Sequence, residues 1–443
     1  MAQPVKFYIV TDTHFRPNSM CENNEAYREY MKYEQMCLAE NEAILKATFA
    51  EIAKDNETNI VIMPGDLSKD GEKQSHIEFL KYLDALRQTG KKIYVITARH
   101  DFNSNATAFI NGGRNPVEGT TKEELYDLYY EYGYSDAVAK HEGSMSYVAQ
   151  IAPGIRMLAL DSDGETDGEG KGSVSGDILA WAKQQAIEAK NTGNAMFVIC
   201  HYPILPSSPF FELVRDARLE NRDEVIETLA DNGVNLAFTG HMHIQSANVV
   251  RTEKGNEFWD ICTSALVGSP AAYRKVEFDG RTADIKTLKV PAFDWDMQDL
   301  SNDEYFDRQF ECRIKNRIDR TLSGKKGFKG IAFALVKHII NTLTLGGIAR
   351  LSWVRIDKSL KKVKFLDFAC TIAINMFKGD EPFVEGTPEY EAVAKVVKRF
   401  SFIIKKVEPK LSKTKKLDLK QMVFDSIGNN KGFSDNDLTI KLK

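Results

Sequence analysis

Short runs of apolar residues alternate with longer amphipathic stretches over the first 290 residues of the chain. The apolar runs have the length of buried strands and lie at 7–10, 60–63, 93–97, 155–160, 196–200 and 236–239. Three more follow with no helical pattern between them, at 258–263, 275–278 and 283–288. The amphipathic stretches predict helices at 34–54, 76–89, 122–132, 177–191 and 223–232. Because strands and helices alternate, we expect α/β layering, with the late strands in a second, mixed sheet.

The pattern changes near Val290 and Pro291 and becomes mainly helical. It predicts helices at 301–322, 328–345, 353–377, 387–407 and 417–427, and a short edge strand at 438–442. The chain has 443 residues, more than one core usually supports, so two domains are expected. We place the boundary between residues 290 and 291, which gives domains 1–290 and 291–443.

Charge supports this division. Residues 291–443 hold 29 Lys and Arg against 20 Asp and Glu, and subtraction from the totals of 59 and 63 leaves 30 against 43 for residues 1–290. An acidic first domain is therefore followed by a basic, mainly helical one. The basic lysines predict a weak contact with acidic surfaces or membranes, and no strong nucleic-acid signal is present.

Targeting and redox signals are weak. The N-terminus enters a strand almost at once, so no signal peptide is visible, and we expect a cytoplasmic protein unless a leader precedes Met1. The longest apolar stretch, 331–349, is interrupted by Lys337, His338 and Asn341, which favours a buried helix over a membrane span. The six cysteines show no C-x-x-C spacing, which excludes a zinc ribbon or a thioredoxin-type pair.

Ionisable residues gather at the ends of the predicted strands. Ligands of α/β sheets bind beyond the carboxyl ends of strands, and five of the eight histidines lie there, whereas His76, His141 and His338 do not. His241 and His243 are two residues apart, so in an extended segment both side chains would point to one place. We expect these strand ends to form one metal site: 12–14, 64–66, 98–101, 161–163, 201 and 240–243.

The ligand types indicate the metals. Aspartate and imidazole without clustered thiolates suit Mn, Fe, Zn or Ni. Asp66 follows Gly65, which allows the backbone to approach an ion closely, so Asp66 is the natural bridging carboxylate. Two ions about 3.5–4 Å apart would hold the attacking and leaving oxygens of an in-line displacement.

The ordered motifs D-x-H, G-D, H-[DE], H and G-H-x-H resemble the calcineurin-like metallophosphoesterases over residues 5–290. More narrowly, the chain is similar to class III cyclic-nucleotide phosphodiesterases and to bacterial homologues with a C-terminal helical domain. The resemblance implies a sandwich of two mixed β-sheets flanked by helices. It implies one ion on Asp12, His14, Asp66 and His243, and a second on Asp66, His201 and His241. His100 would act as the acid, and His201 would also contact substrate.

One position departs from the family. Ala98-Arg99 stands where the family has Gly-Asn before the catalytic histidine, and that asparagine supplies an oxygen to the second ion. Arginine cannot ligate and stays charged. Three arrangements are open: Arg99 contacts a substrate phosphate beside a weakly held second ion, it occupies the second-ion position, or the site has lost turnover.

A second departure concerns the residue that orients His100. Many relatives have an aspartate three residues after the metal ligand, where this chain has Lys69. Asp70 and Asp101 are both open as the orienting carboxylate, and Asp70 is our catalytic candidate.

Three weaker features are interpreted as structural rather than functional. The glycine-rich stretch 164–176 is expected to be a flexible rim loop, and His76 a surface or capping residue. The five tyrosines between 126 and 134 are expected to pack against one another rather than to stack on a nucleobase.

The resulting hypothesis is a metal-dependent phosphodiesterase that acts on cyclic or other small nucleotides through in-line attack of a metal-bound hydroxide. Arg99 and His100 would contact the substrate. The alternatives are a phosphomonoesterase and an impaired metal- or phosphate-binding scaffold disabled by Arg99.

Overall fold

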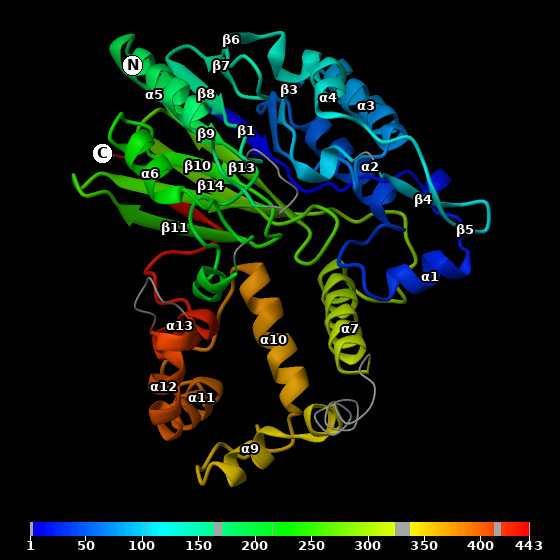
Figure 1. The fold of residues 1–443 in the computed structure, drawn as a ribbon, viewed down its shortest axis with the longest axis vertical. Helices are drawn as coiled ribbons and strands as arrows, with labels where there is room; N and C mark the ends of the chain where they lie inside the picture. Colours follow the sequence, from blue (N-terminus) through cyan, green and yellow to red (C-terminus); the bar gives the residue numbers. More distant parts are fainter. Residues whose placement is uncertain are drawn as a thin grey trace.

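The computed structural model describes residues 3–103, 105–163, 171–214, 216–323, 337–411 and 418–442. Two large mixed sheets lie face to face with helices on their outer sides, and further helices extend from one side of this sandwich (Figure 1). The expected fold class is confirmed.

The first sheet has six strands, and β1, β2 and β3 at one end of it run parallel. Strands β13, β14 and β15 continue it in antiparallel fashion, so two of the late strands that were expected in a second sheet belong to the first. Its order is β15 (Leu438–Lys441), β14 (Thr282–Lys289), β13 (Ala272–Phe278), β1 (Val5–Ile9), β2 (Ile60–Pro64) and β3 (Lys92–Ile96).

The second sheet has seven strands, of which β12, β10, β9 and β8 run parallel. Strands β11, β7 and β6 are antiparallel to their neighbours. Its order is β11 (Ser246–Arg251), β12 (Glu257–Cys262), β10 (Leu236–Thr239), β9 (Ala195–Ile199), β8 (Ile155–Ala159), β7 (Tyr147–Ala152) and β6 (Ala137–Lys140). A small hairpin joins β4 (Thr107–Ile110) and β5 (Gly113–Pro116).

Aromatic side chains fill the space between the two sheets. Phe7 on β1 stacks on Phe197 of β9 with ring centroids 5.1 Å apart, and Phe238 of β10 meets both rings edge-on. All three are fully buried. Burying side chains of this size contributes about 2–3 kcal/mol each, so this layer holds the parallel strands of both sheets in fixed register.

Helices cover the outer faces of both sheets. The first sheet packs under α2 (Asn41–Lys54) and α3 (Lys73–Gln88), and the second under α5 (Gly176–Asn191) and α6 (Arg222–Ala230). The shorter elements are α1 (Glu25–Met31), α4 (Lys122–Leu128), and the 3-10 or π segments η1 (Asn18–Met20), η2 (Arg99–Asp101), η3 (Tyr130–Tyr134) and η4 (Pro209–Leu213).

The C-terminal region is mainly helical, as expected (Figure 1). Its helices are α7 (Asn302–Ser323), α9 (Leu345–Leu351), α10 (Phe365–Lys378), α11 (Pro388–Arg399), α12 (Ser401–Leu411) and α13 (Leu419–Ile427). The final strand β15 returns to the first sheet as its edge strand, as predicted. The division at residue 290 stays a prediction.

Several predicted boundaries are wrong. The helix predicted from residue 34 begins at Asn41, and the one predicted over 353–377 begins at Phe365. The helix predicted over 387–407 is broken at Phe400 into α11 and α12. Residues 328–336 of another predicted helix, and 164–170 of the expected rim loop, lie outside the described residues. No helix in the described part of the chain has the length and apolar character that crossing a membrane requires.

Candidate metal centre

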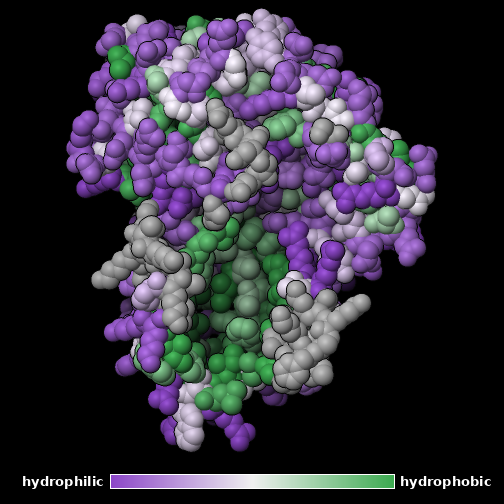
Figure 2. All heavy atoms as spheres, in the orientation of Figure 1, coloured by the Kyte–Doolittle hydropathy of each residue, from purple (hydrophilic) through white to green (hydrophobic). Residues whose placement is uncertain are grey.

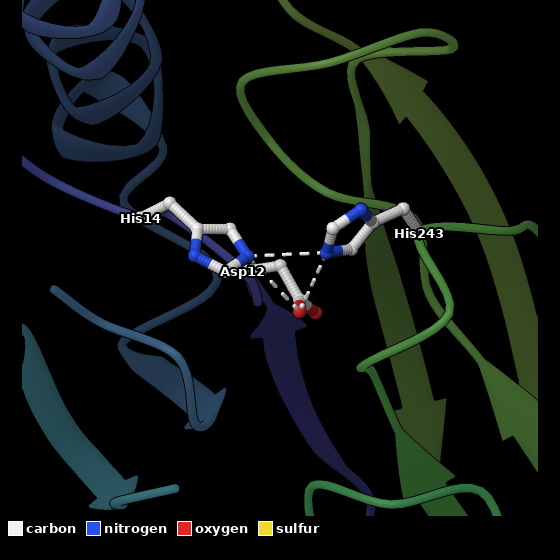
Figure 3. Close-up of side chains that lie close together, drawn as sticks. All are labelled: Asp12, His14 and His243. Carbon is white, nitrogen blue, oxygen red and sulfur yellow. Dashed lines mark hydrogen bonds and ion pairs between the residues drawn. The ribbon is translucent and has the colours of Figure 1, made fainter. Parts of the chain in front are cut away.

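The six residues that the resemblance assigns to metal come together in two adjacent groups. Asp12, His14 and His243 form the first group, which Figure 3 shows with the side chains turned toward one another. Asp66, His201 and His241 form the second. Within each group, the potential ligand atoms all lie within 4.8 Å of one another, although they come from both sheets.

Asp66 links the two groups. Its Oδ2 lies 3.0 Å from Nε2 of His201 and 3.7 Å from Nε2 of His14. A carboxylate in this position can contact ions in both groups, which fits the bridging role expected from the sequence.

The backbone at these residues is not extended. Five of the six have positive φ, a conformation that non-glycine residues seldom adopt. The expectation that His241 and His243 point to one place from an extended segment is therefore wrong, since each joins a different group. The φ values are 51° for Asp12, 38° for His14, 51° for Asp66, 67° for His241 and 58° for His243.

Two glycines make room for the ligands. A Cβ on Gly65 would lie 2.9 Å from Nδ1 of His201, and one on Gly240 would lie 2.4 Å from Oδ2 of Asp12. Both distances are shorter than van der Waals contact. These positions need glycine because ligand side chains already occupy the space beside them.

Backbone carbonyls orient the imidazoles of the second group. Nδ1 of His201 donates to the Pro64 carbonyl at 2.9 Å, and Nε2 of His241 donates to the Asp216 carbonyl at 2.7 Å. Each ring is thereby fixed with its other nitrogen free to ligate. Nε2 of His201 is buried and lies 3.0 Å from Oδ2 of Asp66, so the two atoms that would ligate a cation face the same space.

Burial sets the protonation of the histidines. It lowers the pKa of His14 to about 4 and of His241 to about 3, so both are neutral at pH 7, the form that binds metal. Burial also lowers the pKa of His201, but the nearby Asp66 carboxylate outweighs it and raises the pKa to about 10. A cation at this group would have to displace that proton.

His100 lies beside the first group, with its ring edge-on to His14 at a centroid distance of 5.0 Å. Its backbone N–H donates to Oδ1 of Asp66 at 3.1 Å, and its Nδ1 lies 2.8 Å from the Lys69 carbonyl and 3.2 Å from Oδ1 of Asp70. Burial lowers the pKa of His100, but the Asp66 and Asp70 charges outweigh it, so the net shift is upward. The two carboxylates therefore favour the protonated form of His100.

The hydrogen bonds show which of Asp70 and Asp101 is the partner of the His100 imidazole. The Asp101 carboxylate accepts hydrogen bonds from the backbone N–H groups of Ser68 and Ala98, both at 2.8 Å. Asp101 therefore fixes the turns before His100, and Asp70 is the carboxylate that contacts the imidazole.

A buried ion network holds Asp70. Nη2 of Arg16 lies 3.1 Å from Oδ2 of Asp70, and the same guanidinium donates to Glu72. Arg16 is 1% exposed. Its rigid, permanently charged fork fixes two carboxylates at once, and one of them positions His100.

Arg99 lies at the edge of the second group. Its side chain is 37% exposed, and its Nη2 lies 3.8 Å from Oδ2 of Asp216, the residue whose carbonyl holds His241. A guanidinium that replaced the second ion would be buried among Asp66, His201 and His241. The observed position therefore favours the arrangement in which Arg99 faces the approach to the site.

Sequence reasoning missed three contributors to this centre. Asp216 lies in a loop without a recognisable motif, and Tyr202 packs its ring on His241 at a centroid distance of 4.1 Å. Arg16 gave a weak signal, as a cation two residues after a metal ligand. The contacts that these three residues make with the centre are set by tertiary structure and not by a local sequence pattern.

The interpretation of His76 was wrong. His76 is fully buried, and its two ring nitrogens lie 2.7 Å from the Tyr129 hydroxyl and 2.8 Å from the Asp101 carbonyl. The expected mutual packing of the tyrosines is confirmed, with Tyr126 and Tyr134 rings at 5.1 Å.

Comparison with known proteins identifies a family and several solved structures of limited similarity. The sequence model of the calcineurin-like phosphoesterases matches residues 5–245. Among solved structures, a dimetal phosphatase from Danio rerio is similar over 65% of this chain and 97% of its own, at 12% identity and TM-score 0.47. Yellow lupin purple acid phosphatase is similar over 66% and 52%, at 12% identity and TM-score 0.41.

The NAD nucleotidase of Haemophilus influenzae is similar over 80% of this chain and 71% of its own, at 14% identity and TM-score 0.38. No curated protein matches the sequence.

Proposed function

Because the chain belongs to the calcineurin-like phosphoesterase family, we propose that it hydrolyses phosphodiesters, with cyclic or other small nucleotides as substrates. The observation that carries this proposal is the pair of ligand groups joined through Asp66. Two groups that share one carboxylate could hold two ions close together, an arrangement that stabilises the attacking and leaving oxygens of an in-line phosphoryl displacement.

The donor set fits divalent transition metals. Aspartate oxygens and neutral imidazoles suit Mn, Fe, Zn or Ni, and Nε2 of His201 and Oδ2 of Asp66 lie close together as buried ligand atoms. Asp12, His14, Asp66 and His243 would hold one ion, and Asp66, His201 and His241 the other. Bound ions would supply Lewis acidity toward the phosphoryl oxygens and make water more acidic.

The protein's own residues supply positioning and proton transfer. His100, held by Asp70, would donate a proton to the leaving oxygen. Arg99, partly exposed at the edge of the second group, would pair with a non-bridging phosphate oxygen and would leave Asp216 to do so. The substrate contact expected of His201 stays a prediction, because its Nδ1 donates to the Pro64 carbonyl and its Nε2 faces Asp66.

Hydrolysis of bis-p-nitrophenyl phosphate with added Mn tests this function. We expect turnover that is abolished in His100→Ala and Asp66→Ala. His338→Ala is the matched control, because it removes an exposed imidazole outside the metal centre. Absence of turnover with Mn, Fe, Zn and Ni would favour the scaffold alternative.

Two further measurements refine the result. Faster hydrolysis of p-nitrophenyl phosphate than of the diester would identify a phosphomonoesterase instead. A panel of 2′,3′- and 3′,5′-cyclic nucleotides would then define the substrate class.

The role of Arg99 has its own test. We expect two ions per chain in the native protein, with tighter binding of the second in Arg99→Asn because a nearby cation is replaced by a neutral ligand. An unchanged second affinity in Arg99→Asn would remove the electrostatic argument. Arg99→Ala should raise KM more than it lowers kcat.

A further inference from the structure

Large apolar side chains are exposed at two places in the C-terminal region. Leu351, at the end of α9, is 72% exposed, and Trp353 just after it is 88% exposed. Phe402, in the first turn of α12, is 61% exposed, and Phe400 and Ile403 beside it are exposed as well. We call residues 350–364 the α9 tip and residues 395–406 the α12 tip. Helix α9 and the pair α11–α12 lie at the same end of the molecule, far from the sandwich (Figure 1).

Both tips are strongly basic. The α9 tip holds six Lys and Arg residues against one acid, Asp357, and the α12 tip holds five against none. All eleven cations are exposed. The excess of positive charge at this end therefore surrounds the exposed aromatic and aliphatic side chains.

The apolar surface continues inward from the tips. Figure 2 shows a hollow between the helices of this region whose visible walls are hydrophobic. Helix α10, which lies between α7 and α13 in Figure 1, is rich in apolar residues, and Ile372, Ile374 and Phe377 on it are half-buried. A large apolar surface bordered by cations marks an interaction site, because isolated soluble proteins seldom leave such a surface uncovered.

We propose that the two tips bind the surface of an anionic lipid bilayer. Lysine and arginine would meet lipid phosphates, while Leu351, Trp353 and Phe402 would enter the boundary between headgroups and acyl chains. Tryptophan and phenylalanine beside lysines are the residues that favour this boundary. A second copy of the chain that paired tip to tip is the weaker occupant, since it would bring together two basic surfaces whose one acid is Asp357.

Vesicle flotation of the full chain tests the proposal, and it requires no catalytic activity. We expect binding at low salt to vesicles of equal parts phosphatidylcholine and phosphatidylglycerol, and none to phosphatidylcholine alone. Binding should weaken at about 0.5 M salt, where screening is strong. The double substitution Lys361→Glu and Lys362→Glu should weaken binding by at least about tenfold, and Trp353→Ala by several-fold.

Substitutions of exposed lysines and of an exposed apolar residue elsewhere on the surface are the controls for the loss of vesicle binding. Lys183→Glu with Lys190→Glu alters two exposed lysines on α5, and Val138→Ala shortens an exposed apolar residue of β6. Both controls should bind like the native chain. All variants alter exposed residues, so an unchanged melting temperature will show that they fold.

Three results would overturn the proposal. They are equal binding to both vesicle types, equal losses in the controls, and absence of binding at low salt. A lipid-independent dimer that Trp353→Ala dissociates would instead assign the surface to a second copy of the chain.

Discussion

Five metal-ligand candidates have left-handed backbone conformations, each of which costs about 1 kcal/mol relative to an ordinary conformation. The surrounding fold must supply this energy through contacts that leave the ligands no alternative. The sequence could indicate which residues follow the strands, but not this conformation, because φ at Asp12 or His243 is fixed by neighbours far away in the chain.

Gly240 shows how closely these neighbours pack. Its backbone φ lies outside the left-handed region, so alanine is sterically excluded only by the side chains of Thr11 and Asp12. We expect Gly240→Ala to weaken Mn binding at the first group by at least about tenfold, because Asp12 must move. Isothermal titration with Mn measures this effect.

Gly176→Ala is the control, because a Cβ there would meet nothing within 4 Å. If Gly240→Ala and Gly176→Ala bind Mn with the same affinity, the steric argument is wrong.

His76 predicts a pH effect on stability that is separate from the metal centre. Burial lowers its pKa from 6.5 to about 4, so the folded state resists protonation between these values. The unfolded chain binds more protons in this window, and the stability contributed by neutral His76 is lost as the pH falls from 6.5 to 4. The loss should approach about 3 kcal/mol.

Chemical denaturation of the native chain and of His76→Gln across this pH range measures the contribution of His76 as the difference between their free energies of unfolding. His76→Gln is expected to lose less stability than the native chain on acidification, because glutamine does not titrate. Parallel loss in both proteins would show that His76 does not carry the effect.

At the scale of elements, the short helix η2 and the turn after β2 bring His100 and Asp70 together. The two residues are 30 positions apart, and only the parallel pairing of β2 with β3 makes them neighbours. The sequence could not show whether Asp70 or Asp101 orients His100, because it shows the strand ends but not which carboxylate accepts the backbone hydrogen bonds.

The substitutions Asp70→Asn and Asp101→Asn should therefore differ. Asp70→Asn is expected to lower kcat by about 10–100-fold with a small change in KM, since His100 loses its charged partner. Asp101→Asn should mainly lower the melting temperature, because an amide oxygen cannot accept both hydrogen bonds that the carboxylate accepts. Steady-state kinetics and thermal melting of both variants test this difference. A larger loss of kcat in Asp101→Asn, with a larger loss of melting temperature in Asp70→Asn, would reverse the two roles.

The elements themselves were predictable where burial is continuous. Strands such as β2 and β9 are almost wholly buried, so unbroken apolar runs identify them. Strands β6 and β11 were missed because half of their residues face solvent and include charged side chains.

The helix wrongly predicted from residue 353 shows tertiary structure overriding periodicity. Leu345 N donates to the Val363 carbonyl at 2.9 Å, and Phe365 N donates to the Leu343 carbonyl at 2.8 Å. These long-range bonds use backbone groups that a helix starting at Trp353 would need within itself. The apolar spacing of the segment cannot reveal this competition.

At the scale of the whole molecule, the end of the chain ties the helical region to the sandwich. Arg274 of β13 is fully buried, and its guanidinium donates to the carbonyls of Asp435 at 2.9 Å and Asn436 at 3.0 Å. The following strand β15 then pairs with β14. Helix α10 also contacts the sandwich near the metal centre, since Gln245, two residues after His243, donates from its backbone to the Phe377 carbonyl.

Deleting the chain from Ser434 onward should therefore destabilise the sandwich as well as the helical region. Arg274 would remain a buried cation without two of its acceptors, and β14 would become an unpaired edge, for a combined cost of at least about 3 kcal/mol.

Ile440→Ala is the milder variant if the deletion does not fold, and it should cost about 2–4 kcal/mol because Ile440 is 1% exposed. Lys441→Ala is the control, with little loss expected because it shortens an exposed side chain of β15 and leaves the strand in place. Thermal melting of the soluble chains decides the matter, since melting of the long deletion within a degree or two of the control would show that the sandwich is complete without β15.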